Sequence, residues 1–105
     1  MSSIDPIMVE MGYTPKTTFW NDFTMADAFG VSAIQDTFDR SFRDWKDNIE
    51  YLTELALVLN HKIWQHYETN ESLASLYERL WRYVDDWCYD NLEEEDFDYY
   101  YWLTD

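Results

Sequence analysis

The apolar residues between Ile34 and Ile63 recur in steps of three and four, and this register is the strongest constraint on the fold. Its members are Ile34, Phe38, Phe42, Trp45, Ile49, Leu52, Ala56, Leu59 and Ile63. Such spacing places an apolar stripe along a helix, because an α-helix completes a turn in about 3.6 residues. The chain has only two glycines and two prolines, which favours long helices over a sheet with many turns. We therefore predict an all-α fold, a compact bundle of about four to five helices.

The long stripe raises the question of one helix or two. A single helix over residues 33–67 would be about 50 Å long at about 1.5 Å per residue. A domain of this size should have a radius of gyration of only about 13 Å. The segment Asp47-Asn48-Ile49-Glu50 has the form of a capping box, so we predict a break or kink near Asn48. The unbroken register keeps one continuous helix as the alternative.

Local signals predict where the first helices begin and end. Thr18 is a suitable N-cap for a helix running to about Phe29, and Gly30 suits the position that ends it. Ser32, with Gln35 three residues later, predicts a capping box at the start of the next helix.

The C-terminal third predicts two more helices. After a connector at residues 68–70, a long helix should cover about 71–90. Its predicted inward residues are Leu73, Leu76, Tyr77, Leu80, Val84, Trp87 and Cys88. Asn91 is predicted to cap a final short acidic-aromatic helix with Glu94 at its third position, so that acidic residues 93–96 meet the positive end of the helix dipole. Three rings should fasten this helix to the body: Phe97, Tyr100 and Tyr101.

The length of 105 residues predicts one domain, with residues 1–16 as a lead-in segment. A hydrophobic content of 47% argues against disorder. The stripe spans about four heptads and therefore also allows a coiled-coil homodimer, although its bulky Phe and Trp members fit a globular bundle better.

Charge sets this chain apart. Its 22 acidic and 7 basic side chains give a formal net charge of −15. This charge opposes direct contact with nucleic acid or an anionic membrane, because both are polyanions. It favours basic protein partners, including proteins that bind nucleic acid. The alternative is that the charge serves solubility alone.

The charge is concentrated near the C-terminus. No lysine or arginine follows Arg82. From Trp81 to the end, the chain has nine carboxylates (at 85, 86, 90, 93–96, 98 and 105) and nine aromatic rings (at 81, 83, 87, 89, 97 and 99–102). By contrast, Arg40, Arg43 and Lys46 lie among aspartates at helical pairing distances.

Residues with catalytic or metal-binding chemistry form no recognisable motif. His61 and His66 are five residues apart, unlike the i,i+4 pairs of helical zinc sites. Cys88 continues an inward apolar stripe, and buried cysteines are typically inert. Asp86 and Asp90 lie one turn apart, but the acidic tail lacks the pattern of a calcium loop. We expect a protein that is not an enzyme and uses no metal or cofactor.

A single cysteine excludes an intrachain disulfide. No leader resembles a signal peptide, and no apolar run approaches the roughly 20 residues of a membrane span. We expect a cytoplasmic protein that does not engage membranes.

The acidic tail suggests mimicry of DNA. B-DNA carries one negative charge per about 1.7 Å of helix axis, and helical carboxylates at i,i+3 and i,i+4 stand about 5–6 Å apart. The spacing of the carboxylates is comparable in scale to that of phosphates along a strand. Tyr99 and Trp102 would add anchoring area if exposed beside the acids, and would belong to the core if buried. The predicted partner-binding residues are Asp85, Asp86, Asp90, Glu93, Glu94, Glu95, Asp96, Asp98, Tyr99 and Trp102.

Three stretches, FWNDFTMADAFG, AIQDTFDRSFRDWKDN and YLTELALVLNHKIWQHYE, together with the terminal TD, resemble small acidic proteins carried on conjugative transposons of gut bacteria. The resemblance covers most of the chain from Phe19. It implies a mobile-element setting but no activity and no functional residue. Small acidic proteins of such elements and of phages include antirestriction and anti-CRISPR inhibitors, many of which look like DNA, so the chain is similar to them in kind.

Two functions follow as hypotheses. The first is a non-enzymatic inhibitor that binds a basic surface of a nucleic-acid-handling protein, such as a host defence nuclease. The second is an assembly module of a mobile element that binds through its aromatic helical seam around Phe38, Phe42, Trp45 and Trp64, while its acids only keep it soluble.

Overall fold

The computed structural model describes residues 15–104, and this part of the chain contains helices and no strands. The predicted lead-in segment lies mostly outside the described residues. The helices are α2 (Phe19–Phe29), α3 (Val31–Trp45), α4 (Ile49–His66), α5 (Glu71–Asn91) and α6 (Glu94–Thr104). The prediction of an all-α bundle of four to five helices is confirmed.

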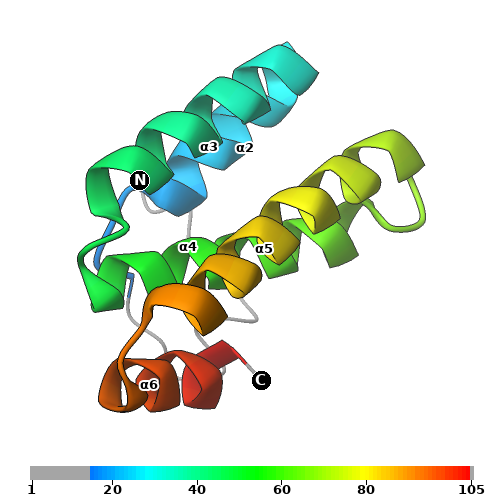
Figure 1. The fold of residues 1–105 in the computed structure, drawn as a ribbon. Helices are drawn as coiled ribbons and strands as arrows, with labels where there is room; N and C mark the ends of the chain where they lie inside the picture. Colours follow the sequence, from blue (N-terminus) through cyan, green and yellow to red (C-terminus); the bar gives the residue numbers. More distant parts are fainter. Residues whose placement is uncertain (1–14, 105) are drawn as a thin grey trace.

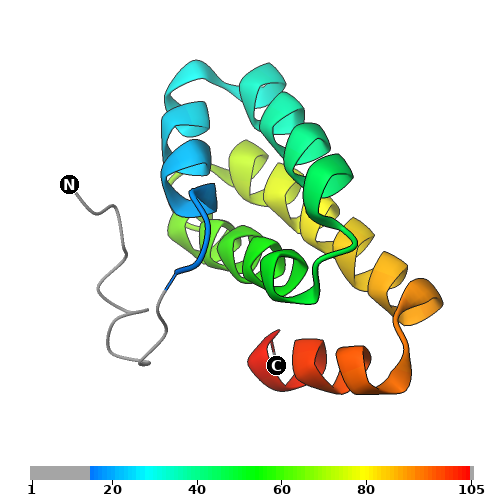
Figure 2. The ribbon, with the colours of Figure 1, turned by 90° about the vertical axis from the view of Figure 1, so that its left-hand side faces the viewer.

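The helices form two antiparallel pairs and a separate end piece. α2 and α3 form one hairpin, which packs on a second hairpin made of α4 and α5 (Figure 1). α6 turns back from the end of α5 and lies against α4 (Figure 2). The Cα radius of gyration is 13.1 Å, so the long stripe is folded back on itself rather than extended.

The break near Asn48 is confirmed. α3 ends at Trp45 and α4 begins at Ile49. Asn48 is the N-cap, and its side-chain oxygen accepts a hydrogen bond from the backbone N–H of Tyr51 at 3.2 Å. The helix therefore begins one residue later than a box led by Asp47 would place it. The apolar register continues through the break because both helices face the same core.

The junction between α2 and α3 is tighter than predicted. Gly30 alone joins them, and its φ of 105° is one that residues other than glycine rarely adopt. Gly30 is also the N-cap of α3, since its carbonyl accepts from Ile34 N–H at 3.1 Å. The predicted N-cap role of Ser32 is therefore wrong, because Ser32 already lies within the first turn. Thr18 does precede α2, but its hydroxyl donates to the Asp22 carboxylate at 2.9 Å rather than capping the backbone.

The start of the final helix also differs from the prediction. Asn91 is the last residue of α5, and its side-chain amide donates to the Trp87 carbonyl at 2.9 Å. α6 begins at Glu94, and the carbonyl of the preceding residue, Glu93, accepts a hydrogen bond from Phe97 N–H at 2.8 Å. The expected cap at Asn91 is wrong because α5 continues one residue further than predicted. Acidic residues do occupy the first turn of α6, as predicted.

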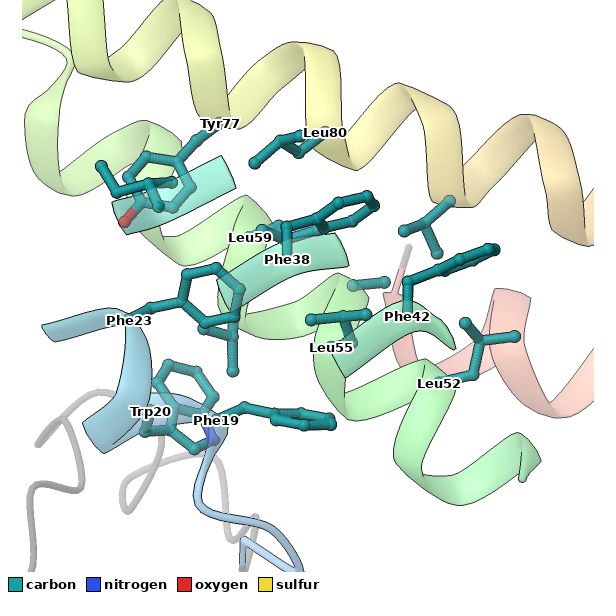
Figure 3. Packing of buried hydrophobic residues seen from close by; sticks show 14 of the residues in the cluster. Phe19, Trp20, Phe23, Phe38, Phe42, Leu52, Leu55, Leu59, Tyr77 and Leu80 are labelled. Carbon is teal, nitrogen blue, oxygen red and sulfur yellow. The ribbon is translucent and has the colours of Figure 1, made fainter. Parts of the chain in front are cut away.

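The buried apolar side chains form one cluster to which every helix contributes. Figure 3 shows how its members from α2, α3, α4 and α5 pack together. Phe23 of α2 meets Tyr77 of α5 edge-on, with ring centroids 6.0 Å apart. Phe38 and Phe42 of α3 stack at 5.7 Å and are almost fully buried. Full burial of such a side chain stabilises the fold by about 1.5–3 kcal/mol. Trp45, another member of the predicted seam, is 40% exposed.

Candidate partner-binding site

α6 is held to the body by one fully buried ring. Tyr100 is 1% exposed, and its hydroxyl donates to the Asp85 carboxylate of α5 at 3.0 Å. Burial, assisted by Cys88 and Asp85 nearby, raises the pKa of Tyr100 above its ordinary value. The other two predicted fasteners contribute less. Phe97 is half-buried, and Tyr101 is 51% exposed.

A chain of rings covers the corner between α5 and α6. Phe97 lies between Tyr89 and Tyr101, with centroid distances of 4.7 and 6.1 Å. Tyr89 is 63% exposed. The corner is therefore both aromatic and open to solvent, and it fixes α6 relative to the end of α5.

The predicted carboxylates fall into two groups. Asp85 is half-buried and engaged by Tyr100, so it supports α6 rather than presenting a free charge. The remaining predicted acids are all exposed on the end of α5, the connector and α6: Asp86, Asp90, Glu93, Glu94, Glu95, Asp96 and Asp98. We call these seven residues the acidic surface.

The acidic surface has little internal compensation. Within residues 15–104, none of its members forms an ion pair. Arg82, the last basic residue of the chain, pairs with Glu78 at 2.9 Å. One cationic side chain from another part of the fold lies nearby. Lys46 lines a hollow of about 310 Å³ together with Glu93 and Asp96. The field of this surface is therefore strongly negative.

The two predicted anchor residues have different surroundings. Trp102 is 78% exposed on the same helix as four of the acids. Tyr99 is half-buried and lies near Lys16, whose pKa is raised by its hydrogen bond to Glu50 and, to a lesser extent, by Tyr99. Trp102 thus has the exposure of an interface anchor, whereas Tyr99 belongs partly to the contact between α6 and residue 16.

A second polar cluster, which was not predicted, joins α2 to α4 and α5. The Asp27 carboxylate accepts from Lys62 Nζ at 2.9 Å, lies 3.0 Å from His66 Nε2, and accepts a short hydrogen bond from the Tyr77 hydroxyl. Lys62 also reaches the Thr24 hydroxyl at 3.2 Å. The side chains of Lys62 and Asp27 are 3% and 14% exposed, so this is a mostly desolvated ion pair.

The electrostatics of this cluster follow from burial and pairing. Burial alone would raise the pKa of Asp27, but hydrogen bonds from Tyr77, Lys62 and His66 outweigh it and hold the pKa below its ordinary value. Burial, followed by the bond to Asp27, raises the pKa of Tyr77. Every polar atom of Asp27 is thereby committed to a partner, which suits a structural tie between helices. A sequence signal existed, because Lys62 follows Leu59 by three residues on an otherwise apolar stripe.

A third unpredicted feature is the buried carboxylate of Glu54. This residue is fully buried in α4 and accepts hydrogen bonds from the backbone N–H groups of Lys16 and Thr17 at 2.7 and 2.9 Å. The Thr17 hydroxyl donates to it as well. Glu54 thus holds the segment that leads into α2 against the side of α4.

The histidines and the cysteine are engaged in packing. The His61 ring lies 5.6 Å from that of Trp20, and His66 stacks on Tyr77 at 5.8 Å. Cys88 is fully buried, as predicted, and burial raises the pKa of its thiol to about 12. A thiol with such a pKa is a poor nucleophile near neutral pH. Among the described residues, no group of three or more His, Cys, Asp or Glu side chains is arranged to hold a metal ion.

None of the helices in residues 15–104 combines the length and the apolar character needed to cross a bilayer. Comparisons of the chain with protein-family models, with curated proteins and with solved structures found no match. The resemblance to mobile-element proteins therefore stays a prediction from the sequence.

Proposed function

We propose that this protein is a non-enzymatic inhibitor that binds a basic surface of a nucleic-acid-handling protein through its acidic surface, in the manner of a DNA mimic. The carrying observation is that seven exposed carboxylates gather on the end of α5 and on α6 without an ion pair among the described residues. A host defence nuclease, of the kind blocked by antirestriction or anti-CRISPR proteins, is the partner class that such a surface fits.

The fixed geometry of the carboxylates supports mimicry over a merely solvated tail. Asp86 and Asp90 lie one turn apart on α5, and helical residues at that spacing stand about 5–6 Å apart. α6 is clamped by Tyr100, so its acids keep a set position relative to those of α5. A fixed array of this kind can approximate the phosphates along one strand of B-DNA, which follow one another at about 3.4 Å of helix axis per charge.

The exposed ring of Trp102 supplies what charge alone does not. Long-range attraction speeds encounter and is screened by salt, whereas a large aromatic side chain slows dissociation, since Trp and Tyr are enriched among energetically dominant interface residues. We propose that Trp102 anchors the complex while the acids steer it.

The test compares two variants that remove equal charge. The first neutralises the acidic surface by Asp90→Asn, Glu93→Gln, Glu94→Gln and Glu95→Gln. The control neutralises four exposed aspartates on and after α3, which lie among the basic residues: Asp36→Asn, Asp39→Asn, Asp44→Asn and Asp47→Asn. Both variants and the unchanged protein serve as bait in a host lysate at about 50 mM and about 500 mM salt, on either side of the range where screening becomes strong.

The proposal expects a basic nucleic-acid enzyme to be captured at low salt by the unchanged protein and the control, and released at high salt. Double-stranded DNA should compete with this capture, because DNA and the acidic surface would occupy the same basic groove of the captured enzyme. Equal capture by both variants, or no competition by DNA, would contradict mimicry.

A second function is favoured by a different observation. Trp45 and Trp64 of the aromatic seam are 40% and 66% exposed, which would suit an assembly module or a homodimer, although Phe38 and Phe42 are buried and cannot take part. Light scattering would then show an oligomer that is insensitive to salt and lost in Trp64→Ala.

A further inference from the structure

A groove of about 680 Å³ runs between the end of α4 and the first half of α5. Its volume lies in the range of ligand pockets, about 300–1,000 Å³. Figure 1 shows α4 and α5 side by side along this stretch, which is at the end of the hairpin near the loop that joins them and away from α6. Its lining residues are Ile63, Trp64, Tyr67, Glu68, Glu71, Ala74, Ser75, Glu78 and Trp81. None of them belongs to the acidic surface.

Three aromatic residues line the groove: Trp64, Tyr67 and Trp81. Trp64 is 66% exposed and Tyr67 is 62% exposed, and their ring centroids lie 5.6 Å apart at an angle of 46°. Trp81 contributes a half-buried ring, whose Nε1 atom is buried with no hydrogen-bond partner among residues 15–104. Two large rings held in contact yet left open to solvent offer faces on which a flat group can stack.

Three glutamates also line the groove, Glu68, Glu71 and Glu78, whereas no lysine or arginine of residues 15–104 does. Glu78 already pairs with Arg82 at 2.9 Å. Glu68 and Glu71 are exposed and form no ion pair within the described part of the chain. The groove therefore combines aromatic faces with uncompensated negative charge.

We infer that this groove binds an arginine side chain presented by a protein partner. A guanidinium group is planar and weakly hydrated, stacks on aromatic faces and donates to carboxylates at the same time. An apolar occupant would instead desolvate the carboxylates that line the groove without pairing them. The inference does not depend on the acidic surface, since the two sites share no residue.

A short synthetic peptide isolates the inference from any natural partner. The probe is an acetylated and amidated Gly-Gly-Arg-Gly-Gly peptide, and its matched control carries citrulline, which keeps the shape but not the charge. Binding is followed by the indole N–H signals of the ¹⁵N-labelled protein, with the Trp64 signal assigned by its loss in Trp64→Phe. We expect a saturable shift at Trp64 with the arginine peptide, and binding of the citrulline peptide weaker by about fivefold or more.

Paired variants separate a site from general attraction. Glu68→Gln with Glu71→Gln should weaken binding of the arginine peptide by about three- to tenfold, whereas Glu94→Gln with Glu95→Gln on α6 should change it by less than about twofold. Trp64→Ala should weaken binding similarly, and because Trp64 is exposed, the variant should fold normally.

Equal losses in the two glutamine pairs would overturn the inference, as would an unmoved Trp64 signal. Concentration-dependent shifts without peptide, together with a dimer that Trp64→Ala dissolves, would assign the groove to a second copy of this chain and also overturn it. None of these outcomes bears on whether the acidic surface binds a basic enzyme, which is read from α6 variants in the capture experiment.

Discussion

Carboxylates occupy two opposite environments in this protein. Asp27 and Glu54 lie inside the helical body, where Asp27 meets a lysine, a histidine and a tyrosine and Glu54 accepts two backbone N–H groups. The acids of α6 lie in solvent and form no ion pair within residues 15–104. The same functional group therefore holds helices together in one region and is left unpaired in the other.

This contrast explains how a chain with a net charge of −15 can be compact while many of its carboxylates stay in solvent. A buried carboxylate must be paired with groups of the protein itself, because moving an unpaired charge out of water has a large free-energy cost. An exposed carboxylate keeps its hydration, so its field extends to whatever approaches. The interior thus fixes the fold, and the exterior leaves its charge exposed to solvent.

The largest effect should come from breaking the buried ion pair. Asp27→Asn leaves Lys62 with no counter-charge in a nearly solvent-free site, so we expect the free energy of unfolding to fall by about 3–5 kcal/mol. Urea denaturation measures this without adding salt. The control Asp96→Asn on α6 should change stability by no more than about 0.5 kcal/mol. Similar losses in both variants would abolish the contrast between the two regions.

A smaller loss is expected at the other buried carboxylate. Lys16 N–H and Thr17 N–H donate to different oxygens of Glu54. Glu54→Gln turns one of these oxygens into an NH2 group, so one bond loses its acceptor and the other loses its charge assistance. Unfolding should therefore become easier by about 1–3 kcal/mol. Amide hydrogen exchange at these two residues should accelerate while exchange in α5 changes little. Unchanged exchange at both amides would mean that Glu54 does not hold this segment.

Acid should weaken the interior of the protein through Asp27. The pKa of Asp27 is lower in the folded protein than in the unfolded chain, so its contribution is present above the ordinary pKa of about 3.9 and is lost as the pH falls through the folded value. Stability measured between about pH 5 and pH 2 should therefore decline more steeply in the unchanged protein than in Asp27→Asn. Parallel declines would contradict the assignment.

Alkali should weaken the core through buried groups that resist ionisation. The pKa of Cys88 rises from 9.0 to about 12, and those of Tyr77 and Tyr100 are also raised. The unfolded chain loses these protons at lower pH than the folded protein does. The contribution of these groups to the free energy of unfolding is therefore fully present below about pH 8.5 and falls as the pH rises beyond that. Cys88→Ala should flatten the decline between about pH 9 and pH 10. Tyr100→Phe should flatten it only above about pH 10, where tyrosine ionises.

The smallest effect on stability is expected where the effect on binding is greatest. Neutralising Asp90, Glu93, Glu94 and Glu95 removes favourable charge near the start of α6 but also relieves repulsion, so unfolding should shift by less than about 1 kcal/mol. Binding to a captured basic partner should weaken, and the slope of affinity against salt should become shallower. A destabilised variant with unchanged affinity would assign these acids to the fold instead.

Much of the helical arrangement could be predicted because it depends on local spacing. The stripe from Ile34 to Ile63 predicted helices. Asn48 predicted the break, because a capping side chain accepts a hydrogen bond from a backbone N–H only two or three residues further along the chain. Where several polar residues could cap, sequence order did not decide among them. Ser32 and Asn91 are suitable caps, but the tight turn at Gly30 and the length of α5 place both of them inside helices.

The candidate site was predictable in position but not in detail. The lack of cations after Arg82 located the acidic surface, because exposure of charged residues is the default. The sequence did not reveal that Asp85 is engaged by Tyr100, or that Tyr99 is half-buried while Trp102 is exposed. Neighbouring residues on a helix point in different directions, and only the packing of α6 against α4 selects which ones face solvent.

Periodicity, capping and charge are local or additive properties, so the residues alone predict the helices, their approximate ends and the sign of the C-terminal field. Which polar groups are structural depends instead on how the helices pack. Lys62 and Tyr77 follow Asp27 by 35 and 50 residues in the chain. They nevertheless bind it, because a hydrogen bond depends on positions in space rather than on separation in sequence. For the same reason, the groove with Trp64 and Trp81 exists only once α4 and α5 lie side by side.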